Sequence, residues 1–171
     1  MNQKLKDKIK KIKLIATDVD GVLTDGGMYY SSKGDTLKKF QARDGMAVSI
    51  LKRNTIPTVI ITKDRNQIVK KWSSKMNIDK LFDGIKNKEE VVPKLCKLYS
   101  LSENNIVYIG DDVNDLEILK RIGFSATPKD GNLEVKKNVD YTCKSRGGEG
   151  VLREVCDLII SMKFGKKDKL Y

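Results

Sequence analysis

The stretch Asp18-Val19-Asp20-Gly21-Val22-Leu23-Thr24-Asp25-Gly26 follows directly after the apolar run Leu14-Ile15-Ala16. The apolar run predicts a buried strand, which ends where the glycine-containing turn begins. Side chains two residues apart in an extended segment point the same way, so the carboxylates of Asp18 and Asp20 face one small volume. Two carboxylates this close repel each other unless a cation or a shared proton relieves them. A hydrophobic core needs no such arrangement, whereas a metal-assisted phosphoryl-transfer site does.

Outward from this stretch, apolar runs alternate with amphipathic segments along the chain. We expect strands near residues 13–17, 57–61, 80–82, 105–109 and 123–126, and helices near residues 2–13, 45–54, 65–76, 88–99, 114–121 and 150–162. The apolar runs are continuous and β-branched, which is typical of a parallel sheet covered on both faces. The expected fold is therefore one doubly wound, Rossmann-like α/β domain over residues 1–171. It has a β-hairpin insertion at about 27–41 after the first strand, no cap domain, and a flexible tail at about 163–171.

The composition is that of an ordinary globular protein, with 39% hydrophobic residues among 171. The longest apolar run falls short of the eighteen or so residues that a transmembrane helix needs, and the first residues show no secretory signal. The cysteines, Cys96, Cys143 and Cys156, are an odd number without metal-binding spacing. We therefore expect reduced thiols in a cytoplasmic protein.

The net charge of +11 raises the question of a nucleic-acid partner. Most basic residues are lysines scattered along the chain, while arginine, which makes bidentate contacts to phosphates and bases, is scarce. Aromatic residues are only 6% of the chain and do not alternate with basic ones as in proteins that bind single strands. We expect no nucleic-acid and no membrane partner. The basic segment 2–13 is expected to lie against the domain, with a membrane-surface helix as the alternative.

Polar residues collect where the expected strands end. Thr62 ends one strand, Asp111 and Asp112 follow another, and Asp115 lies one helical turn further on. Carboxyl ends of parallel strands meet at one edge of a sheet, where ligands bind. The hard oxygens of Asp18 and Asp111 suit Mg²⁺. The sequence has no histidine, so any catalysis uses carboxylates, hydroxyls and amines, and a serine–histidine hydrolase is excluded.

These residues resemble the four motifs of the haloacid dehalogenase superfamily of phosphatases. The matching segments are Asp18 to Gly26, Ile61-Thr62, Lys88 and Gly110-Asp111-Asp112-Val113-Asn114-Asp115. Further segments resemble one capless branch: Phe40, Arg43-Asp44-Gly45, Arg146-Gly147-Gly148-Glu149-Gly150 and Arg153-Glu154-Val155-Cys156. That branch contains 3-deoxy-D-manno-octulosonate 8-phosphate phosphatases, 9-phospho-nonulosonate phosphatases and the phosphatase-like tail domain of some acylneuraminate cytidylyltransferases. The resemblance spans about residues 12–160.

The resemblance implies a role for each motif residue. Asp18 would be the nucleophile that forms an aspartyl-phosphate, and Asp20 would protonate the leaving group and then activate water. Mg²⁺ would bind the Asp18 carboxylate, the Asp20 backbone carbonyl and Asp111. Thr62 and Lys88 would bind the phosphate.

Other positions are implied to support these or to bind the sugar. Asp112 and Asp115 would orient the residues that touch metal and phosphate. The expected substrate-binding residues are Arg43, Lys63, Asp64, Arg146 and Gly147. Relatives often have a glycine followed by an arginine or a glutamate where this chain has Lys63 and Asp64, so the identity of the sugar stays open.

The implied activity is a Mg²⁺-dependent phosphomonoesterase for a phosphorylated sugar acid, with 3-deoxy-D-manno-octulosonate 8-phosphate, a lipopolysaccharide precursor, as the first candidate. One alternative is the 9-phosphate of a nonulosonate of the KDN or N-acylneuraminate type. Another is a catalytically weak phosphatase-like domain associated with acylneuraminate cytidylyltransferase. A signalling receiver domain also uses acids, a threonine and a lysine, but its paired acids come first in the chain, whereas here they come late.

The spacing of the motifs leaves no room for a cap, so the site of a single chain is open. Members of the resembling branch are tetramers in which a neighbour's segment reaches the site. We therefore expect a homotetramer whose subunits complete each other's sites, with the Met28-Tyr29-Tyr30 edge as a candidate interface.

Overall fold

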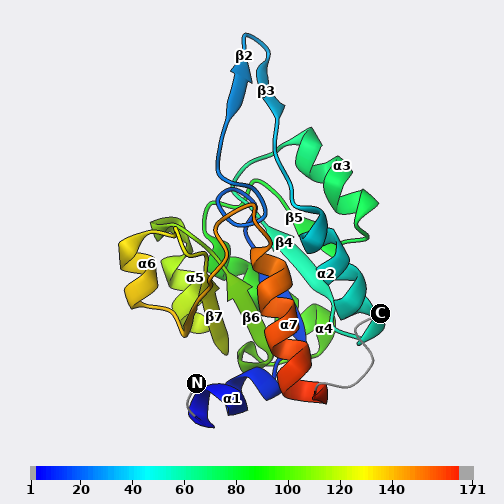
Figure 1. Ribbon diagram of the computed structural model, residues 1–171, viewed down its shortest axis with the longest axis vertical. Helices are drawn as coiled ribbons and strands as arrows, with labels where there is room; N and C mark the ends of the chain where they lie inside the picture. The colour runs from blue at the N-terminus through cyan, green and yellow to red at the C-terminus, as the bar shows by residue number, and fades with distance from the viewer. Residues whose placement is uncertain (1–2, 166–171) are drawn as a thin grey trace.

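The computed structural model describes residues 3–165, and its central feature is a six-stranded parallel sheet (Figure 1). The strand order is β5-β4-β1-β6-β7-β8. The strands are β1 (Leu14–Thr17), β4 (Thr58–Ile61), β5 (Lys80–Phe82), β6 (Ile106–Ile109), β7 (Phe124–Thr127) and β8 (Tyr141–Thr142). The chain builds outward from β1 to β5 on one side and then returns to build β6, β7 and β8 on the other. The predicted doubly wound α/β fold is confirmed, and its switch point lies at β1, between β4 and β6.

Helices cover both faces of this sheet, which is why every residue of β1, β4, β6 and β7 is buried. The helices are α1 (Gln3–Lys10), α2 (Ala42–Arg53), α3 (Gln67–Lys75), α4 (Val92–Tyr99), α5 (Leu116–Arg121), α6 (Leu133–Lys137) and α7 (Val151–Phe164). Strand β1 alternates between the two layers. Ile15 packs with α1, α2 and α7, and Leu14 and Ala16 pack with α4 and α5.

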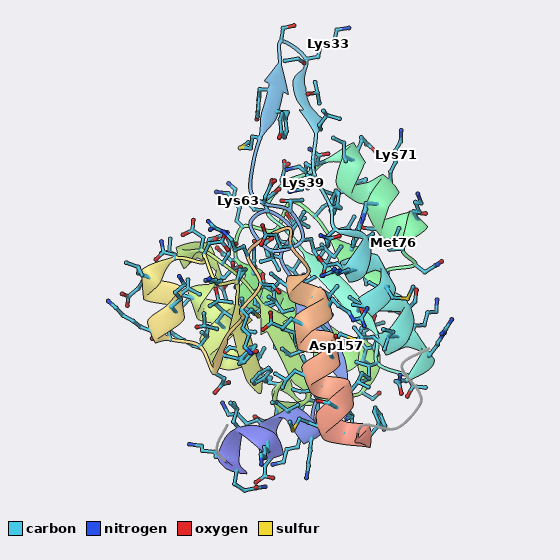
Figure 2. All side chains as sticks on the ribbon, viewed as in Figure 1. Lys33, Lys39, Lys63, Lys71, Met76 and Asp157 are labelled. Atoms are coloured by element: carbon cyan, nitrogen blue, oxygen red, sulfur yellow. The ribbon has the colours of Figure 1, made fainter. Side chains whose placement is uncertain are left out.

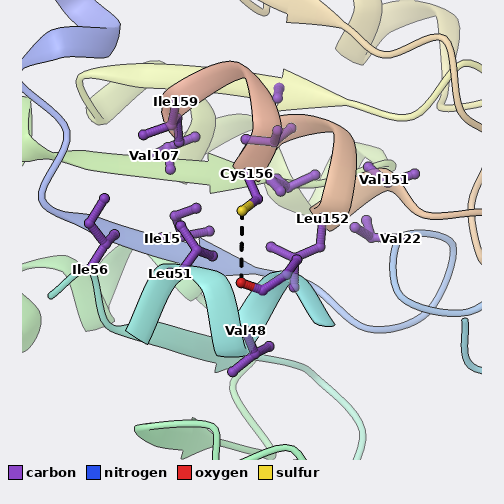
Figure 3. Close-up of a cluster of buried hydrophobic side chains, with 14 of the residues drawn as sticks. Ile15, Val22, Val48, Leu51, Ile56, Val107, Val151, Leu152, Cys156 and Ile159 are labelled. Atoms are coloured by element: carbon purple, nitrogen blue, oxygen red, sulfur yellow. Dashed lines mark hydrogen bonds between the residues drawn. The ribbon is translucent and has the colours of Figure 1, made fainter. Parts of the chain in front are cut away.

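The layer formed by α2 and α7 contains two of the three free cysteines, and Figure 3 shows one of them, Cys156, between the two helices. Cys143 and Cys156 are buried among aliphatic side chains, and the Cys156 Sγ lies 3.8 Å from the Ala47 carbonyl oxygen. Cys96 is half-buried on α4. Both buried thiols have a pKa raised by burial, to about 12 for Cys156 and further for Cys143, so they act as apolar core residues.

The chain segment that connects β1 to α2 forms a two-stranded antiparallel hairpin, which projects from the domain (Figure 1). It is made by β2 (Tyr29–Ser31) and β3 (Gly34–Leu37), and the large apolar side chains Met28, Tyr29, Tyr30 and Leu37 on it are more than half exposed. Figure 2 shows Lys33 at its tip and Lys39 where it rejoins the domain. Within residues 3–165, the other connections around the sheet hold only single helices and short turns, and no cap domain is present.

The structure corrects several predicted boundaries. The helix predicted from residue 45 begins at Ala42, and the one predicted from residue 88 begins with the 3₁₀ turn η1 (Lys88–Val91). Helix α6 and strand β8 were not expected, because five and two residues are too short to show a period.

The chain ends also differ from the prediction. Residues 11–13 lie outside α1, and α7 extends to Phe164, so the first two residues of the predicted flexible tail are helical. The Lys163 Nζ donates to the carbonyl oxygens of Lys10 and Ile12, which fixes the end of α7 against the start of the chain. Residues 166–171 of that tail lie outside the described residues. None of the helices described is both long and apolar enough to cross a bilayer.

Candidate active site

Asp18 is held at the carboxyl end of the central strand by its own backbone and by the turn that follows. Its N–H donates to the Ile109 carbonyl at 2.9 Å, which places the residue between β1 and β6. The next residues wind around the Val19 carbonyl, which accepts from the N–H groups of Val22, Leu23 and Thr24. Gly21 has φ +82°, a conformation that favours glycine, so the turn depends on it. Asp18 is only 6% exposed, and its side-chain Oδ1 accepts from the Val19 N–H at 2.7 Å.

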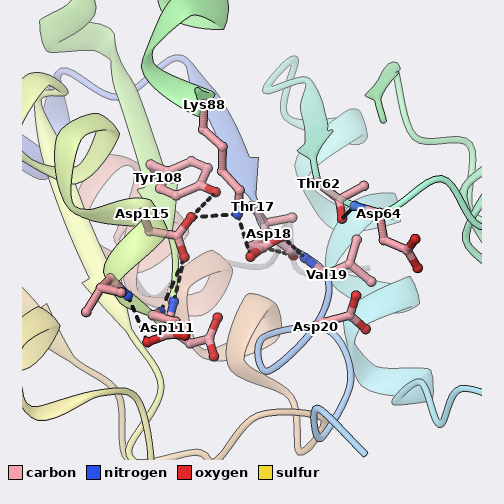
Figure 4. Close-up of polar contacts among 12 residues, drawn as sticks. Thr17, Asp18, Val19, Asp20, Thr62, Asp64, Lys88, Tyr108, Asp111 and Asp115 are labelled. Atoms are coloured by element: carbon pink, nitrogen blue, oxygen red, sulfur yellow. Dashed lines mark hydrogen bonds and ion pairs between the residues drawn. The ribbon is translucent and has the colours of Figure 1, made fainter. Parts of the chain in front are cut away.

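A fully buried lysine links Asp18 to a second acid (Figure 4). Lys88, the first residue of η1, donates from Nζ to Asp18 Oδ2 at 2.5 Å and to Asp115 Oδ1 at 2.7 Å. Burial alone would lower the pKa of Lys88, but the two carboxylates outweigh it and raise that pKa above its usual value. Lys88 therefore remains a cation at the floor of the site.

Asp115 is buried and surrounded by hydrogen-bond donors. Its Oδ1 also accepts from the Tyr108 hydroxyl at 2.8 Å, and its Oδ2 accepts from the N–H groups of Asp111 at 3.0 Å and Asp112 at 3.4 Å. The Tyr108 hydroxyl keeps its proton, because burial and the nearby acids raise its pKa far above the usual value. Four donors on one carboxylate leave Asp115 committed to orienting Lys88 and the backbone after β6. Tyr108 was not predicted as a site residue, because in the sequence it looks like one more apolar residue of the strand.

The carboxylates at the centre of the site are hard to ionise together. The pKa of Asp18 is raised to about 7 by burial, against the opposing effect of Lys88. The pKa of Asp111 is raised to about 8, first by burial and then by the charges of Asp18 and Asp115. Such groups lose their protons fully at neutral pH only when a cation is added.

The same residues provide oxygens for a divalent cation. One carboxylate oxygen from each of Asp18, Asp111 and Asp115 lies within 4.8 Å of the others. Because Asp115 is already saturated, Asp18 and Asp111 are the pair that fits a cation, and hard carboxylate oxygens suit Mg²⁺. A Cβ on Gly21 would lie 2.1 Å from Asp111 Oδ2, so the bare glycine leaves the space that this carboxylate occupies.

A cavity of about 500 Å³ opens above these groups. Its lining residues are Asp18, Asp20, Gly21, Gly26, Thr62, Lys63, Asp64, Asp111, Asp112 and Asn114. Thr62 is 2% exposed at the end of β4, and its hydroxyl oxygen accepts from the Asp64 N–H at 3.3 Å (Figure 4). The lining carries five carboxylates against one lysine, so an anionic ligand meets a strongly acidic surface.

Asp20 lies at the mouth of this cavity, where Lys38 contacts it. The Lys38 Nζ lies 2.6 Å from Asp20 Oδ1 and 3.9 Å from Asp64 Oδ2. Lys38 follows β3, and its side chain is only 2% exposed. Sequence reasoning missed this residue, since a lysine at the end of an exposed hairpin looks like any other surface lysine.

Three of the predicted substrate-binding residues are placed outside the cavity of this single chain. Arg43 is exposed on α2, and the Arg146 Nε donates to Asp130 Oδ2 at 3.2 Å. The Gly147 N–H donates to Asp130 Oδ1, and a Cβ on Gly147 would lie 2.2 Å from the Gly21 carbonyl oxygen. Residues 146–148 thus brace the turn after Asp18, and direct contact of these three residues with substrate stays a prediction.

A doubly wound sheet with acids, a threonine and a buried lysine at its switch point is the arrangement of an α/β protein that transfers phosphoryl groups. A family model described as haloacid dehalogenase-like hydrolase matches residues 52–155. This chain belongs to the haloacid dehalogenase-like hydrolases and is a phosphoric monoester hydrolase of that family. The resemblance seen in the motifs is thereby confirmed.

Individual relatives agree with this family. The 3-deoxy-D-manno-octulosonate 8-phosphate phosphatase of Escherichia coli (strain K12) is 33% identical over 162 residues, which cover 95% of this chain and 86% of that protein. A crystal structure of the phosphatase of that name from Yersinia pestis matches with a TM-score of 0.93 at 29% identity, covering 96% of this chain and 89% of the other. The Moraxella catarrhalis phosphatase, solved in complex with a magnesium ion, a phosphate ion and KDO, is 33% identical with a TM-score of 0.90 and covers 95% and 93%.

Proposed function

We propose that this protein hydrolyses 3-deoxy-D-manno-octulosonate 8-phosphate to the free sugar acid and inorganic phosphate. The observation that carries the proposal is the buried Asp18–Lys88–Asp115 array beneath an open cavity, in a chain that aligns over 95% of its length with phosphatases of this name. The same array would serve the hydrolysis of any phosphomonoester. We therefore infer the reaction type from the array and the identity of the sugar acid from the relatives.

The reaction we propose uses the two carboxylates in the roles that the motif resemblance implies, and their positions at the cavity support it. The Asp18 carboxylate attacks phosphorus, the bond from phosphorus to the sugar oxygen breaks, and the carboxyl group of Asp20 gives its proton to that oxygen. The Asp20 carboxylate then takes a proton from a water molecule, whose oxygen attacks the phosphoryl group on Asp18. Phosphate leaves, and the Asp18 carboxylate and the Asp20 carboxyl group are restored.

Lys88 and Thr62 act without exchanging protons. The Lys88 ammonium group holds the Asp18 carboxylate in place and stays charged, so it stabilises negative charge as the phosphoryl group transfers. The Thr62 hydroxyl, at the end of the neighbouring strand, donates to a phosphoryl oxygen. Removing one such preorganised donor typically costs about 3–4 kcal/mol of barrier reduction.

Mg²⁺ fits beside Asp18 and Asp111, with the Asp20 backbone carbonyl as the third protein ligand that the motif resemblance implies. When bound, it neutralises charge on the phosphoryl oxygens. Asp18 and Asp111 both have a raised pKa in this structure, so a cation held between them would favour their ionised forms. Asp112 lies on the rim, where its Oδ1 accepts from the Val113 N–H, and it supports the loop after β6.

The assembly in this proposal is a homotetramer of one-domain chains in the cytoplasm. The exposed apolar side chains of the hairpin support it, since a lone two-stranded ribbon is only marginally stable in water. Packing hairpins together would cover them and bring a neighbour's segment over each open cavity. Light scattering on the purified protein tests this assembly, and a fully active monomer would contradict it.

Phosphate release from a panel of sugar phosphates, with Mg²⁺ and with a chelator, tests the function. We expect turnover of octulosonate 8-phosphate that requires Mg²⁺ and is abolished by Asp18→Asn, while Asp7→Asn on the exposed face of α1 serves as the matched control. Asp64 on the cavity wall is the specific observation that keeps 9-phosphates of nonulosonates as the second candidate. A clear preference for them would overturn the proposed substrate, and turnover by Asp18→Asn at the wild-type rate would overturn the covalent mechanism.

A further inference from the structure

The lysine at the base of the hairpin makes an ion pair that nothing in the motifs assigns. Lys38 leaves a hairpin whose strands are exposed, yet its own side chain is 2% exposed and its Nζ lies 2.6 Å from Asp20 Oδ1. The Thr24 hydroxyl donates to the same oxygen at 3.4 Å. Lys39, the next residue, is 61% exposed and pairs with Asp25 at 3.7 Å instead. Two adjacent lysines therefore have opposite environments, and only one of them contacts the site.

The direction of this contact matters for the chemistry of Asp20. Both donors that reach its carboxyl group from the described part of the chain act on Oδ1. Oδ2 is thereby left as the oxygen that can carry a proton to the leaving group. Lys38 also lies 3.9 Å from Asp64 Oδ2, and Figure 4 shows Asp20 and Asp64 on the same side of Asp18. The sugar end of the substrate must lie on that side, because Asp20 serves the oxygen that joins sugar to phosphorus.

We propose that Lys38 is a positioning residue that fixes the Asp20 carboxyl group for proton transfer to the leaving oxygen. This inference rests on the acid–base role of Asp20 in the proposed function. It also gives the hairpin a part in catalysis, since Lys38 connects the end of β3 to the mouth of the cavity. A misplacement of about 1 Å in such a group can cost on the order of 100-fold in rate.

A comparison of leaving groups separates this role from a structural one. An alkoxide leaving from a sugar needs a proton from Asp20, whereas p-nitrophenolate is stable enough to leave without one. We expect Lys38→Met to lower kcat/KM for octulosonate 8-phosphate and for glucose 6-phosphate by about 100-fold. The same variant should keep nearly the wild-type kcat/KM for p-nitrophenyl phosphate. This ratio reports the steps up to release of the leaving group, and not the later hydrolysis of the aspartyl-phosphate, in which Asp20 acts for every substrate. Asp20→Asn should show the same selective loss, and Lys38→Arg should recover part of it.

Lys39→Met is the matched control, and its ratio of alkyl to aryl turnover should stay at the wild-type value. A melting curve for each variant establishes that it is folded. Equal losses on alkyl and aryl phosphates in Lys38→Met, or a rise in KM alone, would overturn the inference, because they indicate a structural latch or a substrate ligand. Failure of the proposed substrate would show differently, as wild-type protein that prefers glucose 6-phosphate to the sugar-acid phosphate, and the leaving-group ratio would still test Lys38.

Discussion

Replacing Lys88 with methionine tests whether the buried ion array holds the site together. The Lys88 Nζ bonds Asp18 at 2.5 Å and Asp115 at 2.7 Å, and the lysine side chain is fully buried. Methionine fills much of the same volume but carries no charge, so two buried carboxylates lose their cation. Lys86→Met, which removes an exposed lysine two residues away, is the matched control.

Removing one partner of a buried ion pair costs about 3–5 kcal/mol, because the other partner is left as an uncompensated charge. For a chain of 171 residues this corresponds to a fall in melting temperature of roughly 6–20 °C. The activity should fall by about 10²–10³-fold in kcat, the loss typical of one preorganised donor. Lys86→Met should change neither quantity.

The sign of the pH dependence gives a second, independent check. The pKa of Asp18 is raised to about 7 in the folded protein although Lys88 lowers it, so without Lys88 it rises further. When the folded pKa of a carboxyl group is raised, the protein loses stability as pH rises from the unfolded pKa to the folded pKa of that group. The gap in unfolding free energy between wild type and Lys88→Met should therefore be larger at about pH 8 than at about pH 6. Urea unfolding at the two pH values measures it, and a gap that is absent or shrinks with pH would refute this account of the array.

Three further substitutions address other parts of the site and its support. Asp44 is buried, one of its oxygens has no hydrogen-bond partner among the described residues, and burial raises its pKa to about 7. Its ionisation costs stability as pH rises from about 4 to about 7, so Asp44→Asn should gain up to about 4 kcal/mol at pH 8 in urea unfolding and little at pH 4. Tyr108→Phe removes a donor to Asp115 and should cost about 1 kcal/mol of stability in the same assay, with a smaller loss of kcat than Lys88→Met. Gly21→Ala places a Cβ where Asp111 lies and should raise the Mg²⁺ concentration needed for half-maximal activity, measured by titration.

The central sheet was predictable because each of its main strands is marked by an apolar run in the local sequence. The apolar runs that became β1, β4 and β6 are continuous because helices cover both faces, and that pattern is visible in the sequence alone. The early start of α2 was not visible, since residues 42–44 continue no apolar period. Strand β8 is defined by its pairing with β7 rather than by its two residues, so only the three-dimensional structure reveals it.

Some residues of the site were likewise predictable from local sequence, and others were not. Asp18, Thr62 and Asp111 come at strand ends, and parallel strands must bring their carboxyl ends together, so local sequence was enough to group them. Lys88 comes from a 3₁₀ turn that no strand positions, and only its resemblance to a motif drew attention to it. Lys38 had neither signal, because its burial depends on how the end of the hairpin folds back onto Asp20.

The whole chain and the cavity differ in the sign of their charge. The chain carries a net charge of +11, which favours the approach of an anionic sugar phosphate from a distance. The cavity that receives it is lined by five carboxylates and one lysine, so close contact is unfavourable unless that charge is offset. Lys88 offsets part of it from below and Lys38 offsets part of it at the mouth. The negative charge that these lysines do not offset lies on Asp18 and Asp111, and a divalent cation fits between them. The acidity of the cavity is therefore itself an argument that the reaction depends on Mg²⁺.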